Sequence, residues 1–237
     1  MKAIILAAGL GSRLNAITRE TPKALVEVNG FTMLETVIRK LKDKGITEFL
    51  VNIHHFGQKI INFLDANNNF GVHISISDER EELLNTGGAI LKARDFIHGK
   101  EDILIHNVDI FSDVNLLKMH NYHTEKNCMA TLCIRKRDTK RYLLFDDYNN
   151  LNGWTNTATN EFKWVLEKPL QFHPFAFSGI YIINPEFVEK INQKGSFSII
   201  DSWLEVAKHD IVKGFIDKST IWHDLGTIER ITEAEKK

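Results

Sequence analysis

Short apolar runs alternate with helical patterns along the first half of the chain. Residues 2–6 and 48–53 read as buried strands, and residues 33–42 place their apolar side chains on one helical face. The alternation continues, with helices expected at 57–66 and 86–96 and strands at 72–77 and 103–106. Strands that alternate with helices in this way predict a mostly parallel sheet with helices on both faces.

The second half of the chain is less regular. We expect strands at 129–134, 142–145, 162–166, 175–183 and 211–216, a helix opening at Pro185, and helices at 199–207 and 228–234. Residues 146–159 are rich in turn-forming residues. No internal repeat, linker or low-complexity segment interrupts the chain, so one domain with an insertion-like second lobe is the simplest organisation.

Composition narrows the functional classes. The 237 residues are 43% hydrophobic with a net charge of −1, which suits a globular α/β protein and disfavours nucleic-acid binding. No apolar stretch approaches the roughly 20 residues that span a bilayer, and the N-terminal apolar run leads into a glycine loop rather than a cleavage site. Two cysteines, Cys128 and Cys133, are five positions apart, so on one strand they would face opposite sides and could not bridge easily; a reducing, cytoplasmic setting is expected.

The loop after the first strand carries the strongest chemical signal. The sequence A-A-G-L-G-S-R includes Gly9, Gly11 and Arg13, and Lys23 follows in T-P-K-A-L. Glycines let backbone N–H groups approach phosphate oxygens, and two cationic side chains suit a polyphosphate. The segment therefore predicts a nucleoside triphosphate site.

Two familiar phosphate loops do not match this segment. A P-loop needs G-x-x-x-x-G-K-[ST], which is missing here. The dinucleotide fingerprint needs a third glycine, and the expected second strand ends at His54 and His55 rather than at an acidic residue. A nicotinamide oxidoreductase is therefore a weak alternative.

Two aspartates from distant parts of the chain are candidate metal ligands. Asp109 follows the expected strand at 103–106, and Asp224 lies in W-H-D-L-G-T before the last helix. Each alone reads more simply as a turn residue or a helix cap. Proteins typically hold Mg²⁺ with one or two carboxylates plus substrate phosphates. Near a phosphate loop, these two aspartates together could supply those carboxylates.

Three further motifs have both a plain and a functional interpretation. Glu167-Lys168-Pro169 is either a solvated loop or a site for a sugar phosphate, and Gly179 inside a strong strand marks close approach of a ligand or of another backbone. Thr86-Gly87-Gly88 is either an ordinary helix start or a place where free N–H groups meet an anion or a base.

These motifs, in this order, resemble the sugar-1-phosphate nucleotidyltransferases. The resemblance covers essentially the whole chain, and the short length is most similar to the N-acetylmuramate-1-phosphate uridylyltransferases, with compact mannose-1-phosphate guanylyltransferases close behind. It implies a Rossmann-like three-layer α/β sandwich with a mixed, mostly parallel central sheet and a smaller sugar-binding lobe. The single domain, 1–237, would divide into a nucleotide-binding half of about 1–110 and a sugar-binding half of about 111–237.

The resemblance also assigns roles. The nucleotide would lie against Leu6, Ala8, Gly9, Gly11, Glu82, Gly87 and Gly88. Arg13 would bind the departing pyrophosphate, Lys23 would hold the α-phosphate near the sugar phosphate, and Asp109 and Asp224 would bind Mg²⁺. The sugar would contact Glu167 and Gly179, and Lys168 its phosphate.

The sequence departs from the family pattern at three positions. Val108 stands where glycine usually precedes the metal aspartate, Asn15 stands where proline often follows the arginine, and Ala24 follows Lys23 where proline is common. A β-branched residue resists positive φ, so the turn at Val108 is expected to differ from that of relatives.

The expected reaction joins a nucleoside triphosphate to a sugar 1-phosphate and releases pyrophosphate, with uridylyl transfer to an amino-sugar 1-phosphate favoured. The alternatives are mannose-1-phosphate guanylyltransferase, a phosphocholine-type cytidylyltransferase and a non-catalytic nucleotide-binding homologue. The expected partners are the two substrates, with neither nucleic acid nor membrane, while base, sugar and oligomeric state stay open.

Overall fold

The computed structural model describes residues 1–14 and 18–235, so Asn15 lies outside the described residues. The chain forms two compact units, each assembled from separate stretches of sequence. Unit 1 contains residues 1–84, 105–113 and 220–237, and unit 2 contains residues 85–104 and 114–219.

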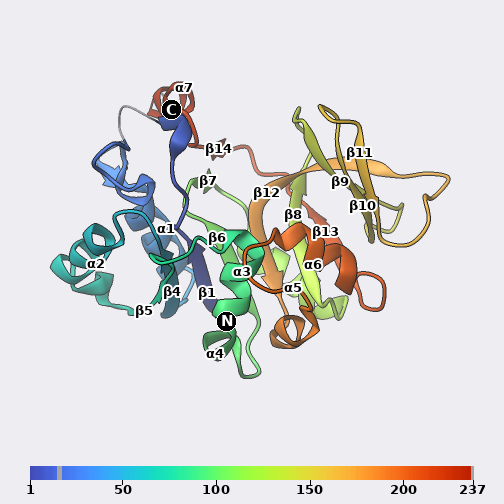
Figure 1. The fold of residues 1–237 in the computed structure, drawn as a ribbon, viewed down its shortest axis with the longest axis horizontal. Helices are drawn as coiled ribbons and strands as arrows, with labels where there is room; N and C mark the ends of the chain where they lie inside the picture. Colours follow the sequence, from blue (N-terminus) through green and yellow to red (C-terminus); the bar gives the residue numbers. More distant parts are fainter. Residues whose placement is uncertain (15–17, 236–237) are drawn as a thin grey trace. The chain divides into compact units, whose positions relative to one another are not determined.

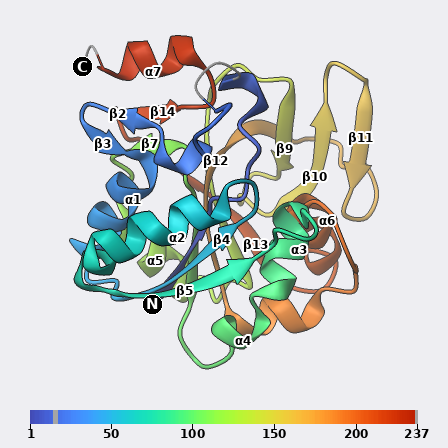
Figure 2. The same cartoon turned by 60° about the vertical axis from the view of Figure 1, so that its left-hand side comes forward.

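Unit 1 is built on parallel strands. β1 (Lys2–Leu6) pairs with β4 (Glu48–Ile53), and β4 pairs with β5 (His73–Asp78), as Figures 1 and 2 both show. The part of β6 (Ile103–Asn107) that belongs to this unit follows β1 on its other side. Apolar runs predicted β1 and β4, and most side chains of these two strands are buried.

The helices of unit 1 cover apolar faces. In α1 (Met33–Lys42) the five apolar residues predicted to face inward are all buried, and the Thr32 side chain caps the helix by accepting from the Glu35 amide. The remaining elements are α2 (Gly57–Ala66), α7 (Ile228–Glu235), the strands β2 (Glu27–Val28), β3 (Phe31–Thr32), β7 (Ile110–Ser112) and β14 (Trp222–Asp224), and the 3₁₀ turns η1 (Ser12–Leu14), η2 (Lys23–Leu25) and η3 (Asn68–Gly71).

Unit 2 is mainly antiparallel. Its strand order is β11-β10-β9-β12, with β8 pairing antiparallel to β12 and parallel to β13. The strands are β8 (Ala130–Arg135), β9 (Arg141–Phe145), β10 (Leu151–Asn156), β11 (Glu161–Trp164), β12 (His173–Ile183) and β13 (Val212–Ile216). With the parallel strands of unit 1, these pairings confirm the predicted α/β class with a mixed sheet.

The helices of unit 2 are α3 (Asn85–Lys92), α4 (Arg94–Ile97), α5 (Leu116–Glu125) and α6 (Ile199–Val206), with a 3₁₀ turn, η4 (Pro185–Lys190). The predicted helix at 86–96 is therefore two helices. At the core, the rings of Tyr181 and Trp203 meet edge to face, 5.0 Å apart, and both are almost fully buried.

Two elements of unit 2 were not predicted from the sequence. The turn-rich stretch 146–159 contains β10, because turns at Asp146 and Asn156 flank a six-residue strand that the turn signals concealed. The helix α5 was not identified, because polar residues interrupt its apolar face. Its start is marked by Asn115, whose side chain accepts from the Lys118 amide at 2.9 Å.

Across the described residues, none of the helices combines the length and apolar character needed to cross a bilayer. Both cysteines, Cys128 and Cys133, are buried.

Candidate active site

Lys23 and Asp109 form an ion pair in unit 1. Lys23 opens η2 directly after Pro22, and Asp109 occupies the turn between β6 and β7. The Val108 amide donates to the Leu6 carbonyl at 3.1 Å, so the turn that holds Asp109 lies beside the end of β1, where the glycine loop begins. The ammonium and carboxylate are 9% and 20% exposed, so solvent screens this pair less than a surface pair.

The second predicted carboxylate comes from a neighbouring strand. β14 pairs antiparallel to β7 with Asp224 opposite Ile110. The Leu225 amide donates to the Asp109 carbonyl at 2.8 Å, which continues the pairing by one residue. Asp109 and Asp224, 115 positions apart in the chain, therefore belong to adjacent steps of the same short ladder.

Asp224 is held by two contacts. Its Oδ2 pairs with Arg230 Nη1 of α7 at 2.6 Å, and its Oδ1 accepts the Gly226 amide at 3.0 Å. Arg13 also reaches this corner, because a Cβ built on Gly226 would lie 3.0 Å from Arg13 Nη2 and 2.8 Å from Asp224 Oδ1. The structure thus brings Arg13 of the glycine loop to the C-terminal motif.

A divalent cation that shares its coordination with substrate phosphates takes carboxylate ligands of this type. Asp109 and Asp224 offer the carboxylate oxygens that Mg²⁺ prefers, and both already attract cationic side chains. The described residues contain no group of three or more ligating side chains, so a closed protein cage is not formed among them. Mg²⁺ in phosphoryl-transfer sites is usually held by one or two carboxylates plus the substrate.

Some backbone amides at the start of the glycine loop are already hydrogen-bonded within the protein. The Ala7 and Ala8 amides donate to Asn52 Oδ1 at 2.6 and 3.2 Å, so they are engaged within the protein. The residues that follow, Gly9 and Leu10, are exposed. The loop from Gly9 onward is therefore the part that can meet a ligand.

Gly11 is required by the backbone. Its φ of +62° is in the left-handed region, which residues other than glycine rarely adopt without strain. A Cβ there would lie 2.9 Å from Thr18 Cγ2 and 3.2 Å from Lys23 Cβ. The Thr18 hydroxyl also donates to the Gly11 carbonyl at 3.0 Å, so this turn places Lys23 against the loop.

The departure at Val108 leaves an ordinary backbone. Val108 is not among the residues with positive φ, so its β-branched side chain is not strained there. It is 5% exposed and lines an apolar cavity of about 200 Å³ with Val37, Ile110 and Leu225. The side chain of Val108 is therefore part of the apolar core, directly before Asp109 in the chain.

The residues predicted to lie beside the base are Glu82, Gly87 and Gly88, and the contacts of Gly87 are packing contacts within the protein. In unit 2 the Gly87 amide donates to the Phe197 carbonyl at 2.9 Å, and a Cβ on Gly87 would lie 2.3 Å from the Phe197 ring. This glycine is explained by the contact of α3 with α6, and Gly88 beside it is buried. In unit 1, Glu82 is exposed in a turn closed by its amide and the Glu79 carbonyl.

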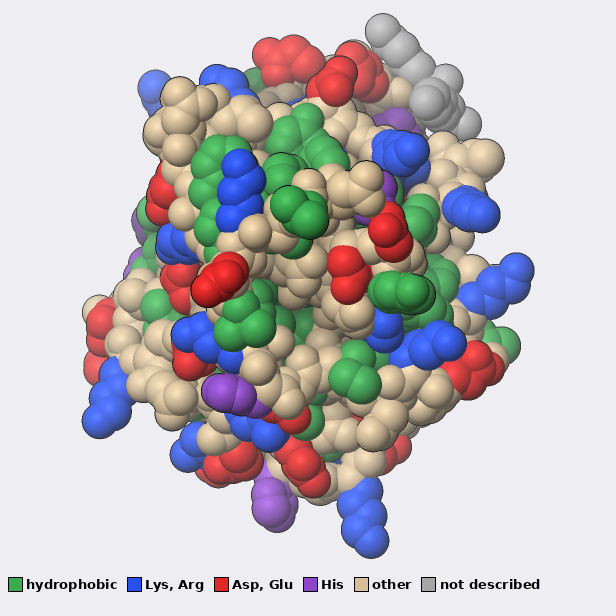
Figure 3. All heavy atoms as spheres, turned by 90° about the vertical axis from the view of Figure 1, so that its right-hand side faces the viewer, with side chains coloured by type: hydrophobic (Ala, Val, Ile, Leu, Met, Phe, Trp, Pro, Cys, Tyr) green, Lys and Arg blue, Asp and Glu red, His purple; other side chains and the backbone are tan. Residues whose placement is uncertain are grey.

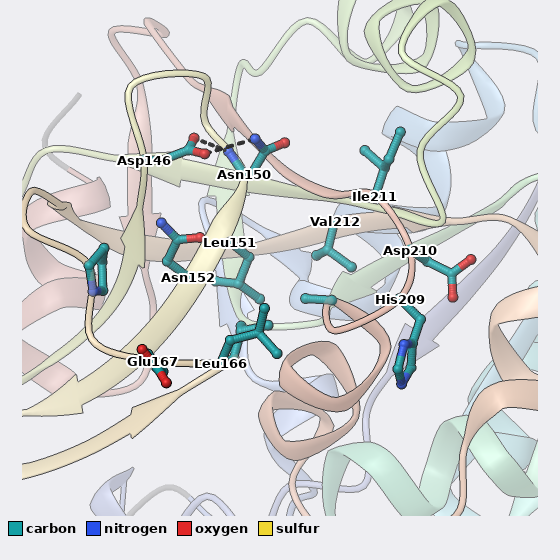
Figure 4. A pocket seen from close by; sticks show the side chains of 13 residues that line it. Asp146, Asn150, Leu151, Asn152, Leu166, Glu167, His209, Asp210, Ile211 and Val212 are labelled. Carbon is teal, nitrogen blue, oxygen red and sulfur yellow. Dashed lines mark hydrogen bonds between the residues drawn. The ribbon is translucent and has the colours of Figure 1, made fainter.

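The predicted sugar residues lie in unit 2. Glu167 lines a cavity of about 450 Å³, which Figure 4 shows together with Asn152, His209 and Asp210. Lys168 is exposed and is not among the lining residues, and Gly179 is buried in β12. Gly179 has a φ of +79° where the register of β12 against β8 shifts, so it has a backbone reason to be glycine.

Aromatic side chains gather on β11 and the loop after it. Phe162 stacks on Trp164 with ring centroids 5.6 Å apart, and Trp164 meets Phe172 at 5.3 Å. Leu166 and Leu170 are 73% and 105% exposed nearby in sequence. Figure 3 shows hydrophobic side chains interspersed with charged ones on this side of unit 2.

Sequence reasoning missed Asn52, Glu79 and Arg230. Asn52 is a polar residue inside an otherwise apolar strand, which is the signal that could have identified it. Glu79 and Arg230 have ordinary local contexts, and only the fold reveals their partners.

Comparisons with known proteins agree with this architecture. The chain is similar in structure to HddC from Yersinia pseudotuberculosis complexed with GMP-PN, with a TM-score of 0.78 and 22% identity over 99% of this chain and 98% of that one. It therefore shares the α/β fold of that protein.

Sequence comparison defines the family. Residues 2–237 match the model of the Nucleotidyl transferase family, and the chain belongs to this family. A probable mannose-1-phosphate guanylyltransferase 1 of Oryza sativa is 30% identical over 201 residues, which are 82% of this chain and 53% of the rice protein, so the chain spans about half of that relative. An N-acetylmuramate alpha-1-phosphate uridylyltransferase of Neisseria meningitidis is 28% identical over 99% of this chain and 97% of its own length.

Proposed function

We propose that this protein is a sugar-1-phosphate nucleotidyltransferase that releases pyrophosphate. The observation that carries the proposal is the Lys23–Asp109 ion pair at the end of β6, with Asp224 on the adjacent strand and Arg13 beside Gly226. Cations and carboxylates in this arrangement match the charges of a triphosphate and its metal. No nucleophilic side chain is needed, because the acceptor phosphate is itself ionised at neutral pH.

The proposed reaction is an in-line displacement. An oxygen of the sugar 1-phosphate forms a bond to the α-phosphorus of the nucleoside triphosphate, and the bond from that phosphorus to the bridging oxygen of the β-phosphate breaks. Pyrophosphate leaves with that electron pair. Lys23 holds the α-phosphate and the acceptor phosphate near one another, and Arg13 neutralises the charge that develops on pyrophosphate. Asp109 and Asp224 would hold Mg²⁺, which supplies further charge neutralisation when bound.

The base and the sugar are assigned by resemblance. Leu6, Ala8, Gly9 and Gly11 would contact the nucleotide, with Glu82, Gly87 and Gly88 beside the base. Because the Ala8 amide is engaged by Asn52, we assign its contact to the carbonyl or side chain. Glu167 and Gly179 would contact the sugar, and Lys168 its phosphate; of these three, Glu167 lines the cavity of about 450 Å³.

Uridylyl transfer to an amino-sugar 1-phosphate is the favoured specific activity. This choice is supported by the Neisseria relative, because the match covers 99% of this chain and 97% of that protein. Guanylyl transfer to mannose 1-phosphate is the second candidate, because the rice relative is similar at 30% identity. We also propose a cytoplasmic location, with which the two buried, free cysteines accord.

The deciding experiment measures pyrophosphate release with UTP, GTP, CTP and dTTP against a panel of sugar 1-phosphates and phosphocholine, with and without Mg²⁺. Release with one triphosphate and a sugar 1-phosphate, dependent on the metal, supports the proposal and names the substrates. Triphosphate binding without release with any acceptor would indicate a non-catalytic homologue and overturn it.

A further inference from the structure

Asn52 is a buried amide at the end of β4 whose acceptor is fully used. Its side chain is in a residue that is 4% exposed, and Oδ1 receives the Ala7 amide at 2.6 Å and the Ala8 amide at 3.2 Å. The parallel register places Leu6 opposite Asn52, so these two amides are the first beyond β1. Asn52 thereby fixes the backbone that enters the glycine loop.

The other end of the same amide holds a different loop. Asn52 Nδ2 donates to Glu79 Oε1 at 2.8 Å, and Glu79 is 1% exposed. Glu79 Oε2 accepts the Leu84 amide at 3.2 Å, which closes the turn that contains Glu82. Figures 1 and 2 show β4 between β1 and β5. This series of hydrogen bonds therefore links the loop that follows β1 to the loop that follows β5.

This series of hydrogen bonds has a fixed polarity. Backbone amides donate to Asn52 Oδ1, Asn52 Nδ2 donates to Glu79, and the Leu84 amide donates to Glu79. In a buried network each donor must face an acceptor, because an unmatched pair loses the bond and keeps the desolvation cost. A substitution that exchanges donor for acceptor on one side chain therefore breaks the network. The matching exchange on the other side chain restores it.

We propose that Asn52 and Glu79 are positioning residues that preorganise the triphosphate site. They contact the backbone of both loops, and they hold the segment from Gly9 to Gly11 and the turn of Glu82 in one arrangement before the nucleotide arrives. This inference rests on the proposed function, since it concerns the same site. Preorganisation lowers the cost of ordering on binding, so its loss weakens nucleotide affinity more than it changes the chemical step.

The test exchanges the polarity of the pair. Asn52→Asp keeps the acceptor for Ala7 and Ala8 but turns an oxygen toward Glu79, whereas Glu79→Gln turns a donor toward either Asn52 or Leu84. The double variant keeps the total charge and matches every donor: the new carboxylate accepts from the glutamine amide, and the glutamine oxygen accepts from Leu84. Asn67→Asp is the control, because exposed Asn67 also loses a donor bond, to the Phe63 carbonyl at 2.8 Å.

Calorimetric titration with Mg²⁺ and the triphosphate that wild type binds best, without acceptor, gives the affinity. We expect each single variant to bind at least about tenfold more weakly and the double variant to recover to within about threefold, with KM for the triphosphate following and KM for the sugar phosphate unchanged. Amide exchange at Ala7 and Ala8 should quicken in each single variant and slow again in the double variant.

Each outcome decides between the two proposals. If wild type binds none of the four triphosphates, the proposed function fails and this inference with it. If wild type binds and a folded single variant binds equally well, or the double variant does not recover, only the inference is overturned. If one single variant does not fold, the other carries the same test, and a double variant that also fails to fold counts against the inference.

Discussion

Lys23 and Asp109, 86 residues apart in the chain, meet as an ion pair in the interior of unit 1, where Lys23 is 8% exposed. The pair joins the segment after the glycine loop to the turn after β6. In the proposed reaction the same two groups serve the α-phosphate and the metal. In this structure each of the two charges is neutralised by the other.

Removal of either partner is expected to abolish most of the activity. Lys23→Ala and Asp109→Ala should each lower kcat by at least about 100-fold, the scale on which one preorganised electrostatic group acts. The measurement is steady-state pyrophosphate release, with thermal melting to verify folding. Lys44→Ala, which removes an exposed lysine of the same unit, is the control and should retain wild-type turnover. Full activity in either site variant would refute its assigned role.

The two glycines of the loop should respond differently to alanine. Gly11→Ala meets a φ of +62° and a Cβ contact of 2.9 Å with Thr18, so we expect a loss of about 1 kcal/mol or more in unfolding free energy. Gly9 has no positive φ and nothing within 4 Å of a built Cβ, so Gly9→Ala should fold as wild type. If Gly9 admits a phosphate closely, that stable variant still binds triphosphate at least about tenfold more weakly.

Thermal melting and triphosphate titration of both variants check this contrast. A Gly9→Ala variant that melts and binds as wild type does would show that the loop does not need a bare backbone at that position.

Arg230 is expected to compete with the metal for Asp224. Its guanidinium lies 2.6 Å from Asp224 Oδ2, and it is 45% exposed, so the ion pair is worth little to stability. Without that positive charge the carboxylate should attract a divalent cation more strongly, while the Gly226 amide still orients Oδ1. We expect Arg230→Gln to lower the Mg²⁺ concentration for half-maximal activity and the calorimetric Kd for Mn²⁺ by about twofold to fivefold.

Arg39→Gln, which breaks an exposed pair with Glu35 on α1, should leave both metal constants unchanged. Weaker metal binding in Arg230→Gln would instead mean that the arginine holds Asp224 in its binding orientation.

The local pattern of apolar and polar residues predicted many of the helices and strands. Features that depend on pairing between distant residues were harder to predict. The apolar runs of β1 and β4 and the amphipathic spacing of α1 are properties of neighbouring residues, and the structure confirms them. β10 was missed because its strand signal is weaker than the turns that flank it. For the candidate site, Arg13 and Lys23 were singled out by their charge near the glycine loop and Asp109 and Asp224 by their positions, and the resemblance to a family then assigned a role to each.

The network around Asn52 escaped the same reasoning for a physical reason. The bonds of Asn52 itself join residues 27 to 45 positions apart, and each partner taken alone is a backbone amide or an ordinary carboxylate. Only the register of β4 between β1 and β5 makes them neighbours.

His106 should make the protein less stable in mild acid. Complete burial, with the Lys40 ammonium nearby, lowers the pKa of His106 to about 3, and Nε2 has no hydrogen-bond partner among the described residues. The unfolded chain binds a proton below the ordinary histidine pKa of about 6.5, whereas the folded protein does not until far lower pH. The stabilising effect is therefore complete above pH 7 and is lost at up to about 1.4 kcal/mol per pH unit as the pH falls from about 6.5 toward 3.

Melting temperatures between pH 4 and pH 8 test this dependence. His106→Gln should flatten the slope, and His55→Gln, at an exposed position, should keep the wild-type slope. Equal slopes in wild type and His106→Gln would mean that another group controls the acid response.

Gly87 offers a test of packing against ligand binding. A Cβ at this position would lie 2.3 Å from the Phe197 ring, so Gly87→Ala should lower the melting temperature by several degrees through overpacking between α3 and α6. Phe197→Leu removes the clashing ring edge at the cost of buried apolar area. In the double variant the two changes should compensate, so that it melts above Gly87→Ala alone. Triphosphate affinity separates the two roles of the glycine: recovery of both stability and affinity assigns Gly87 to packing, whereas recovered stability with lost affinity assigns it to the base as well.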